Sequence, residues 1–331
     1  DLASLTSTDL GSTYEDEFSI GYTQQINSDW SAGVSLMYRN LGRVSEDVLI
    51  DQGVLAYCAR NGIVGCDADY TGQTSYVILN PGYSANVNLL TPLPNGETNI
   101  TMTADDLGLP KVRREYIGLT FDFNREFDGT WGFGGSYTLS RSEGNFEGAL
   151  KSDTGQTDAG IVSDFDFLSF IPGQYGLLPN HHAHQLKLYG TYSPFENFLI
   201  GGNVSVISPR HYGCIGNAPG GYANGDGAVA NDSYGVENAR FCNGIVVDRG
   251  SKFTADWVTR FDLSFRYTIP EDYFPGDLTL RADIFNVFNL DSATDAYEFG
   301  ELDGGAPDPL YRQDTWLQSP RYVRFGIDYK F

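Results

Sequence analysis

The chain has 331 residues and a formal net charge of −22 at pH 7, and it is rich in glycine (39 residues), tyrosine (21) and phenylalanine (21). A balance this acidic excludes nucleic-acid binding as a main role, because phosphate contacts need a basic surface. No run of roughly 18 consecutive apolar residues predicts a membrane helix, although strands that expose only alternate residues to lipid escape that criterion.

Alternation of apolar and polar side chains predicts about nine β-strands. Near residues 17–25, for example, Phe18, Ile20 and Tyr22 share one face and polar residues share the other. This period of two is typical of a strand, because successive side chains point to opposite sides of a sheet. The strands are expected near residues 17–25, 30–39, 112–127, 131–140, 185–192, 198–206, 257–267, 278–284 and 319–331.

The connections between these strands alternate in length. Short turns are expected near residues 27–29, 128–129, 194–197 and 270–275, and long segments at 42–110, 147–180, 213–252 and 291–318. Transmembrane β-barrels keep tight turns on the periplasmic side and long loops outside the cell, whereas a soluble sandwich has no reason to do so. Within the first long segment, residues 77–79 and 86–90 are expected to form small strands or hairpins.

The last strand shows the pattern most clearly. Its apolar face carries Val323, Phe325, Ile327, Tyr329 and Phe331, and its polar face carries Arg324, Asp328 and Lys330. Such a strand fits an all-β, antiparallel transmembrane barrel whose outside meets lipid and whose inside meets water. The alternative is the amphipathic last strand of a soluble sandwich.

Side chains at strand ends and on inward faces also favour the membrane barrel. Aromatic residues such as Trp131 recur at strand ends, where a girdle would meet lipid headgroups. Charges fall on the faces predicted to point inward, including the ladders Arg260/Asp262/Arg266 and Arg281/Asp283. A water-filled lumen accommodates such charges, whereas a dry apolar interior would not hold them without partners.

The four cysteines form two local couples, Cys58 with Cys66 and Cys214 with Cys242, each inside one long segment. An even number in local pairs predicts two loop disulfides and an oxidising compartment. A metal site is the weaker interpretation, because no C-x-x-C spacing occurs and histidine is scarce.

The predicted topology assigns sides of the membrane. If the last strand ends in the periplasm, every short turn lies there, and every long loop and both cysteine couples lie outside the cell. Single-chain bacterial barrels have an even number of strands, so about nine strands indicate a part of a larger barrel. No signal peptide opens the chain, so it was removed or this is a piece of a longer chain.

Several stretches resemble one family of membrane proteins. They are residues 135–148 (GSYTLSRSEGNFEG), 178–184 (LPNHHAH) and 280–289 (LRADIFNVFN), together with the closing Phe331. They are similar to the C-terminal barrel of TonB-dependent outer-membrane receptors, in particular the Oar-like branch, and the resemblance covers most of residues 112–331.

The resemblance implies an importer in the bacterial outer membrane, with a barrel of about 22 strands, a plug domain inside it and energy from the TonB complex. The plug and its TonB-binding segment lie N-terminal in the family and neither is visible here, so residues 1–331 are expected to be the C-terminal part of the barrel. Expected partners are membrane lipid and lipopolysaccharide, an extracellular or surface protein, and the barrel-assembly machinery, which would read Tyr329 and Phe331.

Candidate ligand contacts are confined to the long loops. Aromatic side chains there could stack on a sugar or hold a peptide, namely Tyr70, Tyr76, Tyr212, Tyr222, Tyr234 and Trp316. His181, His182 and His184 resemble a metal cluster, but a polar strand start explains them better. The acidic, glycine-rich residues 224–227 and 301–305 could hold Ca²⁺, although they lack EF-hand spacing and fit solvated loops; no other cofactor is expected.

Three functions remain open at this stage. Transport, with ligand capture by the outer loops and plug-gated passage, is the leading hypothesis. The alternative is a barrel that displays disulfide-pinned loops as an adhesin or a protein-docking surface. An outer-membrane enzyme is third, and the prediction is that the chain is not an enzyme, since no P-loop, HExxH or G-x-S-x-G stretch occurs.

Overall fold

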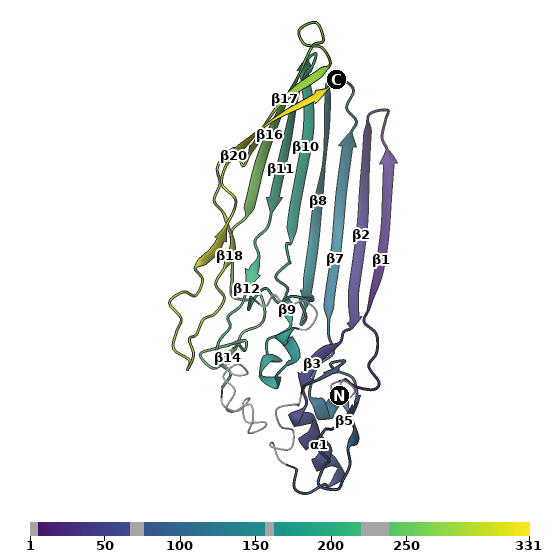
Figure 1. Cartoon of the computed structure of the whole chain (residues 1–331), viewed down its shortest axis with the longest axis vertical. Coiled ribbons are helices and arrows are strands. Elements are labelled where there is room, and N and C mark those ends of the chain that lie inside the picture. The colour runs from purple at the N-terminus through teal and green to yellow at the C-terminus, as the bar shows by residue number, and fades with distance from the viewer. Residues whose placement is uncertain (1–5, 67–75, 156–161, 220–237) are drawn as a thin grey trace.

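The computed structural model describes residues 6–66, 76–155, 162–219 and 238–331. Nine long antiparallel strands form one curved sheet in which every strand pairs with its neighbours along the chain (Figure 1). They are β1 (Tyr14–Gln25), β2 (Trp30–Arg43), β7 (Arg114–Arg125), β8 (Trp131–Gly144), β10 (His184–Phe195), β11 (Phe198–Ile207), β16 (Val258–Ile269), β17 (Asp277–Phe285) and β20 (Tyr322–Lys330). The nine predicted strands are confirmed, with ends that differ by a few residues.

The strand register gives the sheet one apolar and one polar face. Ile20 opposes Leu36, which opposes Leu119, so apolar side chains form rows across neighbouring strands. Many of these side chains are open to the surroundings: Ile20 is 60 % exposed and Phe325 is 79 % exposed. An apolar face of this extent is not stable in water, whereas contact with acyl chains accounts for it.

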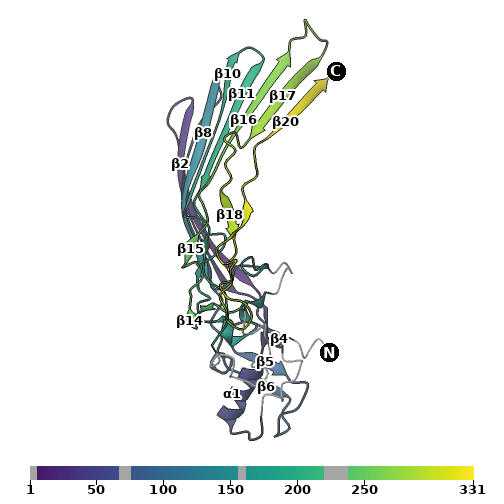
Figure 2. The same cartoon turned by 90° about the vertical axis from the view of Figure 1, so that its left-hand side faces the viewer.

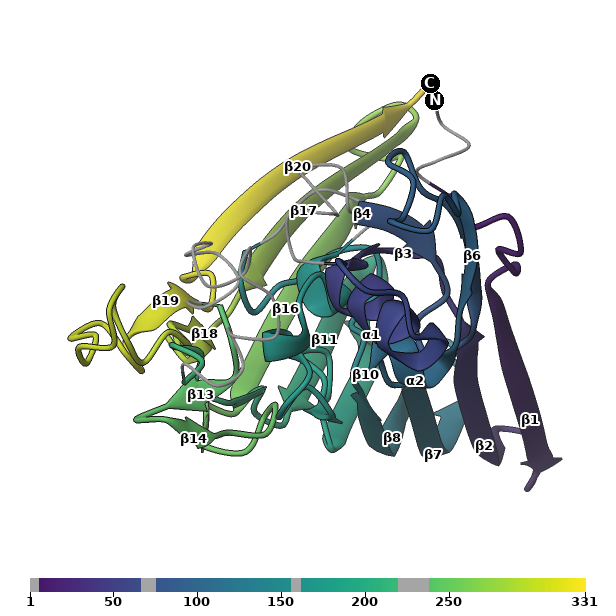
Figure 3. The ribbon, with the colours of Figure 1, turned by 90° about the horizontal axis from the view of Figure 1, so that it is seen from below.

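The sheet is open, with β1 and β20 at its two edges. Seen from the loop end, the strands follow an arc rather than a closed ring (Figure 3). The structure is therefore a large antiparallel sheet with the form of a partial barrel, as predicted.

Short turns and long connections lie at opposite ends of the sheet (Figures 1 and 2). The turns between β1 and β2, β7 and β8, β10 and β11, and β16 and β17 gather at the end that also holds the C-terminus. The long connections are called the outer loops here: the β2–β7 loop (44–113), the β8–β10 loop (145–183), the β11–β16 loop (208–257) and the β17–β20 loop (286–321). The predicted alternation is confirmed.

The outer loops are folded rather than extended. The β2–β7 loop contains β3 (Glu46–Leu49), α1 (Asp51–Asn61), β4 (Tyr76–Leu79), β5 (Ala85–Asn88), β6 (Asn99–Met102) and α2 (Ala104–Leu107). The β8–β10 loop contains two short 3₁₀ helices, η4 (Ser163–Phe165) and η5 (Leu168–Phe170). The remaining short strands of the outer loops are β9 (Gly176–Leu177), β12 (His211–Tyr212), β13 (Phe241–Cys242), β14 (Ile245–Val246), β15 (Phe253–Thr254), β18 (Ala293–Ala296) and β19 (Asp314–Leu317). The expected small strands at 77–79 and 86–90 correspond to β4 and β5, while the two helices were not anticipated.

The hydrophobic core lies in the outer loops, not in the sheet. One cluster of buried side chains belongs mainly to the β2–β7 loop and includes Val54, Leu79 and Met102. A second joins Phe167 and Phe170 to residues of the β11–β16 loop. Loops surrounded by water must bury their own apolar residues, because the sheet turns its apolar face elsewhere. No helix in the described ranges has the length and hydropathy needed to cross a membrane.

Candidate functional site

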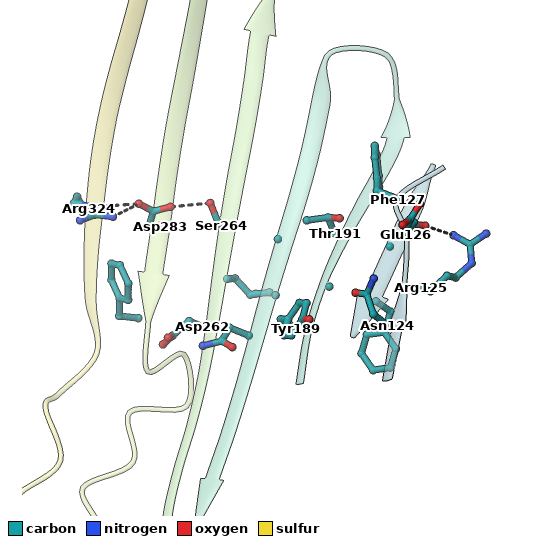
Figure 4. Close-up of a pocket in the computed structure, with 18 residues that line it drawn as sticks. Asn124, Arg125, Glu126, Phe127, Tyr189, Thr191, Asp262, Ser264, Asp283 and Arg324 are labelled. Atoms are coloured by element: carbon teal, nitrogen blue, oxygen red, sulfur yellow. Dashed lines mark hydrogen bonds and ion pairs between the residues drawn. The ribbon is translucent and has the colours of Figure 1, made fainter. Parts of the chain in front are cut away.

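A hollow of about 650 Å³ lies on the polar face of the sheet (Figure 4). Four of its lining residues belong to one cross-strand row, in which Asn124, Gly134, Tyr189, Asn203 and Asp262 oppose one another in turn across β7, β8, β10, β11 and β16. Gly134 leaves room for the Tyr189 ring, since a Cβ atom there would lie 2.7 Å from it. The row offers amide, phenol and carboxylate groups to whatever occupies the interior.

Asp283 organises the charges at one end of this hollow (Figure 4). Its carboxylate accepts hydrogen bonds from Ser264 Oγ at 2.7 Å and from Arg324 at 2.9 and 3.1 Å, and it lies 3.2 Å from Arg281 Nε. Arg266 faces Arg281 across the β16–β17 pair, so this carboxylate also reduces a repulsion between like charges. The predicted inward ladder of Arg281 and Asp283 is confirmed.

Asp262 is held in the same way. It accepts a hydrogen bond from Arg260 Nε at 2.9 Å and from the backbone N–H of Asn286, also at 2.9 Å. The second predicted ladder is therefore present, and it also fixes the point where β17 ends. Because these charges are paired, the hollow presents polar groups without a large net charge, among apolar side chains such as Phe127 and Leu263.

Both predicted disulfides are present. Cys58–Cys66 closes the C-terminal end of α1, where Gly62 adopts the left-handed conformation (φ 67°) that ends the helix. Cys214–Cys242 joins the segment after β12 to β13, and Gly300 of the β17–β20 loop packs against its sulfur atoms. Each bridge braces one outer loop internally.

The aromatic residues suggested for ligand contact have different positions. Tyr212 has no exposed surface; it stacks on Phe253 and donates a hydrogen bond to Asp295 at 2.8 Å. Tyr76 packs edge-on against Phe167. The suggestion is corrected for Tyr212, whose side chain lies in the interior of the loops, whereas for Tyr76, which is partly exposed, it stays a prediction. Trp316 is 70 % exposed and is open to a ligand. Tyr70, Tyr222 and Tyr234 lie outside the described residues.

All four histidines of the chain gather where β8, β10 and β11 meet the outer loops. His181 Nδ1 accepts the backbone N–H of Ser142 at 3.2 Å, and its ring centroid lies 5.5 Å from that of His211. His182 is hydrogen bonded to the Ser208 carbonyl at 2.6 Å, and His184 to Tyr137 at 2.7 Å. Each ring thus serves the strand entry, and no group of three or more metal-binding side chains occurs among the described residues.

Glu301, in one of the two stretches considered for Ca²⁺, is occupied by protein contacts. Its carboxylate accepts hydrogen bonds from the backbone N–H groups of Asn217 at 2.8 Å and Asn243 at 2.5 Å. It thereby links the β17–β20 loop to the β11–β16 loop. The other stretch, 224–227, lies outside the described residues.

A buried cluster of six charged residues was missed by the sequence analysis. Its members come from three outer loops and are each less than 10 % exposed: Lys151, Asp153, Asp164, Arg240, Arg249 and Glu298. Arg249 lies 2.9 Å from Asp164 and 3.8 Å from Asp153, and Lys151 lies 3.3 Å from Asp164. Arg240 pairs with Asp153 and lies 3.6 Å from Glu298.

The cluster balances three cations against three anions. Burial alone would raise the pKa of Asp153, but Arg240 and Arg249 outweigh it and hold that pKa below its usual range. Burial would likewise lower the pKa of Arg249, but Asp164 and Asp153 raise it. Truncating one member would leave its buried partner uncompensated, which is far more costly than losing an exposed ion pair.

Comparison with known proteins finds one curated relative and several solved structures of similar fold. No family model matches the chain. Over 98 % of its length the chain is 23 % identical to the TonB-dependent transporter Oar of Myxococcus xanthus, of which it spans 29 %. Two similar solved structures are P. aeruginosa FpvA bound to heterologous pyoverdines (12 % identity, 97 % of this chain, 28 % of that chain, TM-score 0.47) and the outer membrane transporter YddB from Escherichia coli (13 %, 98 %, 33 %, 0.49). The chain thus spans less than a third of its curated relative.

Proposed function

Because the chain is a distant relative of a TonB-dependent outer-membrane transporter and forms part of such a barrel, we propose that its outer loops capture a ligand and that its polar face lines the ligand's path into the cell. The relative is a transporter, which agrees with the sequence-based prediction of a non-enzymatic protein. The chain's similarity to this class also agrees with the predicted location in the bacterial outer membrane.

One observation supports this proposal most strongly. Along nine strands, side chains alternate between an exposed apolar face and a polar face with paired charges, and all long loops leave the sheet at one end. This division matches a barrel with lipid outside, water inside and large loops above the membrane. A polar solute would meet the outer loops first and the hollow around Tyr189 and Asp283 afterwards.

The remaining parts of the mechanism lie in the rest of the full-length protein. We place a plug domain, with the segment that contacts the TonB complex, there, and we assign residues 1–331 to the C-terminal part of the barrel. Among the suggested aromatic residues that the structure describes, Trp316 is the most exposed, at 70 %, and we infer that it contacts the ligand directly. A flat aromatic side chain binds sugars, peptides and aromatic chelators alike, so the substrate class is left open.

A growth experiment tests the proposal. The full-length protein is deleted from its host, TonB is deleted in a second strain, and both grow on a panel of scarce nutrients. Transport predicts at least one nutrient whose use fails in both strains and is restored by the full-length protein in the first. Normal growth of both strains on every nutrient would contradict it.

Surface display is the second candidate. Two disulfides and a buried charge cluster brace the outer loops, as expected of a scaffold that presents a fixed surface. In that case deletion of the full-length protein would abolish adhesion or partner binding at the cell surface and leave every nutrient phenotype unchanged, in strains with or without TonB.

A further inference from the structure

Residues 162–171 of the β8–β10 loop contact two other outer loops. This stretch, called the joint here, contains η4 and η5. Seen from the loop end, α1, α2 and β3 lie inside the arc of the sheet, over the space that the strands surround (Figure 3). The outer loops therefore cover the mouth of the partial barrel, and the joint lies among them.

The joint binds the β2–β7 loop on one side. Val162 and Phe165 have no exposed surface and belong to the same buried cluster as Val48 and Leu79. The backbone N–H of Val162 donates to Glu46 Oε2 at 2.9 Å, and the N–H of Leu49 donates to the Asp166 carbonyl at 3.3 Å.

The joint binds the β11–β16 loop on the other side. Phe167 and Phe170 are both buried with Ala218, Ala239 and Phe241. Asp164 forms the 2.9 Å ion pair with Arg249, and just beyond the joint the Gly173 carbonyl accepts a hydrogen bond from the backbone N–H of Arg249 at 2.8 Å. Through Arg240 and Glu298 the same charge cluster reaches the β17–β20 loop.

The covalent braces do not cross this joint. Cys58–Cys66 lies within the β2–β7 loop, and Cys214–Cys242 lies within the β11–β16 loop. The contacts that the joint makes to the two braced loops are apolar packing, hydrogen bonds and ion pairs, which can break and re-form without chemistry. Each braced loop keeps its own cross-link when they do.

We propose that residues 162–171 couple two separately braced blocks of the outer loops, so that loosening this joint loosens both blocks together. The blocks are the β2–β7 loop with Cys58–Cys66 and the β11–β16 loop with Cys214–Cys242. This mechanical coupling does not depend on the proposed function.

Hydrogen–deuterium exchange of the full-length protein in detergent tests the coupling. Asp164→Asn removes the carboxylate that faces Arg249 and Lys151, so it should release the joint. We expect amide exchange to rise roughly tenfold or more in residues 46–49 and in residues 239–249 together, while β8 and β10 keep their protection. Phe167→Ala, which leaves every charge in place, should give the same pattern.

Leu150→Ala is the matched control, because Leu150 lies in the same loop and is 49 % exposed; it should leave exchange unchanged. A rise confined to residues 151–174 in both variants, or no rise in either, would overturn the proposal. Failure of the proposed function would appear differently, as a missing growth phenotype for the full-length protein with normal coupling between the two blocks.

Discussion

At the scale of single residues, Glu46 links two outer loops, and the pKa of its carboxyl group is strongly shifted. It has no exposed surface, and burial raises its pKa to about 9. A raised pKa means that the native state keeps a proton that the unfolded chain releases. Glu46 therefore supports the fold below its ordinary pKa of 4.5, and this support is lost progressively as the pH rises towards 9.

Glu46→Gln should remove this dependence, because the amide keeps an acceptor for the Val162 N–H and does not titrate. At pH 8 the opening free energy of the β2–β7 loop should be higher in the variant by about 1–3 kcal/mol, and near pH 5 the two proteins should agree. Hydrogen-exchange protection between pH 5 and 9, with exposed Asp105→Asn as control, measures it. Parallel pH profiles for wild type and variant would refute the explanation.

His181 should make stability depend on pH in the opposite direction, with a loss as the pH falls. It is 5 % exposed, and burial, followed by His211 and Arg141, lowers its pKa to about 4. Protonation would also break the hydrogen bond that Nδ1 accepts from Ser142. Stability at this strand entry should fall as the pH drops from about 6.5 to about 4, by roughly 2–3 kcal/mol.

Protease cleavage within residues 178–184 of the full-length protein, followed through that pH range, reports the loss. His181→Gln should flatten the dependence, because glutamine accepts the same hydrogen bond without titrating. An equally steep dependence in the variant would assign the acid sensitivity to another group.

Residue roles were predictable where the signal is local. The cysteine pairs follow from their spacing, and the inward ladders follow from strand alternation. The buried charges of Arg240, Arg249 and Glu298 could not be identified, because each looks like an ordinary loop charge until loops far apart in sequence meet. Tyr212 was misjudged for the same reason, since burial by a neighbouring loop leaves no mark in the sequence.

At the scale of elements, one arginine ties two short turns together. Arg125 at the end of β7 is 8 % exposed, lies 2.7 Å from Asp128 and 3.7 Å from Asp29, and holds its guanidinium 3.7 Å from the centre of the Trp131 ring. The hydrogen bond from Arg125, followed by those that the backbone N–H groups of Trp131 and Thr130 donate, holds the pKa of Asp128 well below its usual range. The β1–β2 and β7–β8 turns therefore share a single cation.

Arg125→Ala should weaken the sheet at this end by about 1–2 kcal/mol, through the lost cation–π contact and the lost pairing. The measurement is the urea midpoint at which the folded band disappears in semi-native electrophoresis of the full-length protein. Arg39→Ala, which removes an exposed pair with Glu17, is the control and should stay within about 0.5 kcal/mol of wild type. Equal effects of the two variants would contradict the role given to Arg125.

The last strand carries a prediction about assembly. Phe331 is fully exposed, while Tyr329 donates a hydrogen bond to the Pro275 carbonyl at 3.0 Å. Phe331 makes no buried packing contact, so its deletion should change the free energy of unfolding of the purified protein little. The family resemblance predicts that this residue is an assembly signal, so its deletion should lower the amount of protein in the outer membrane several-fold. Unchanged membrane levels would remove that role.

Strands were predictable and helices were not, for a physical reason. A strand with lipid on one side and water on the other must alternate apolar and polar side chains, so the sequence shows its period of two. Helix α1 has no such requirement: of its residues only Asp51, Gly53, Val54 and Cys58 are buried. Its helical period is faint, and packing against the rest of the β2–β7 loop decides its conformation.

At the scale of the whole molecule, the sheet and the outer loops are stabilised in different ways, because lipid contacts the sheet and water surrounds the loops. The sheet turns apolar side chains to the lipid and paired charges to the water, and it has little core of its own. The outer loops, surrounded by water, bury apolar clusters, disulfides and a charge cluster instead. The stability of the sheet therefore depends on the membrane, whereas the outer loops are stabilised by their own buried contacts.

The account depends most directly on which side chains of the sheet touch lipid. Spin labels placed singly on β7 of the full-length protein in lipid vesicles, at Leu119→Cys, Thr120→Cys, Phe121→Cys and Asp122→Cys, measure this through collisions with oxygen and with a water-soluble nickel complex. The account predicts strict alternation, with oxygen favoured at 119 and 121 and the nickel complex favoured at 120 and 122. Equal access of the nickel complex to all four positions would contradict it.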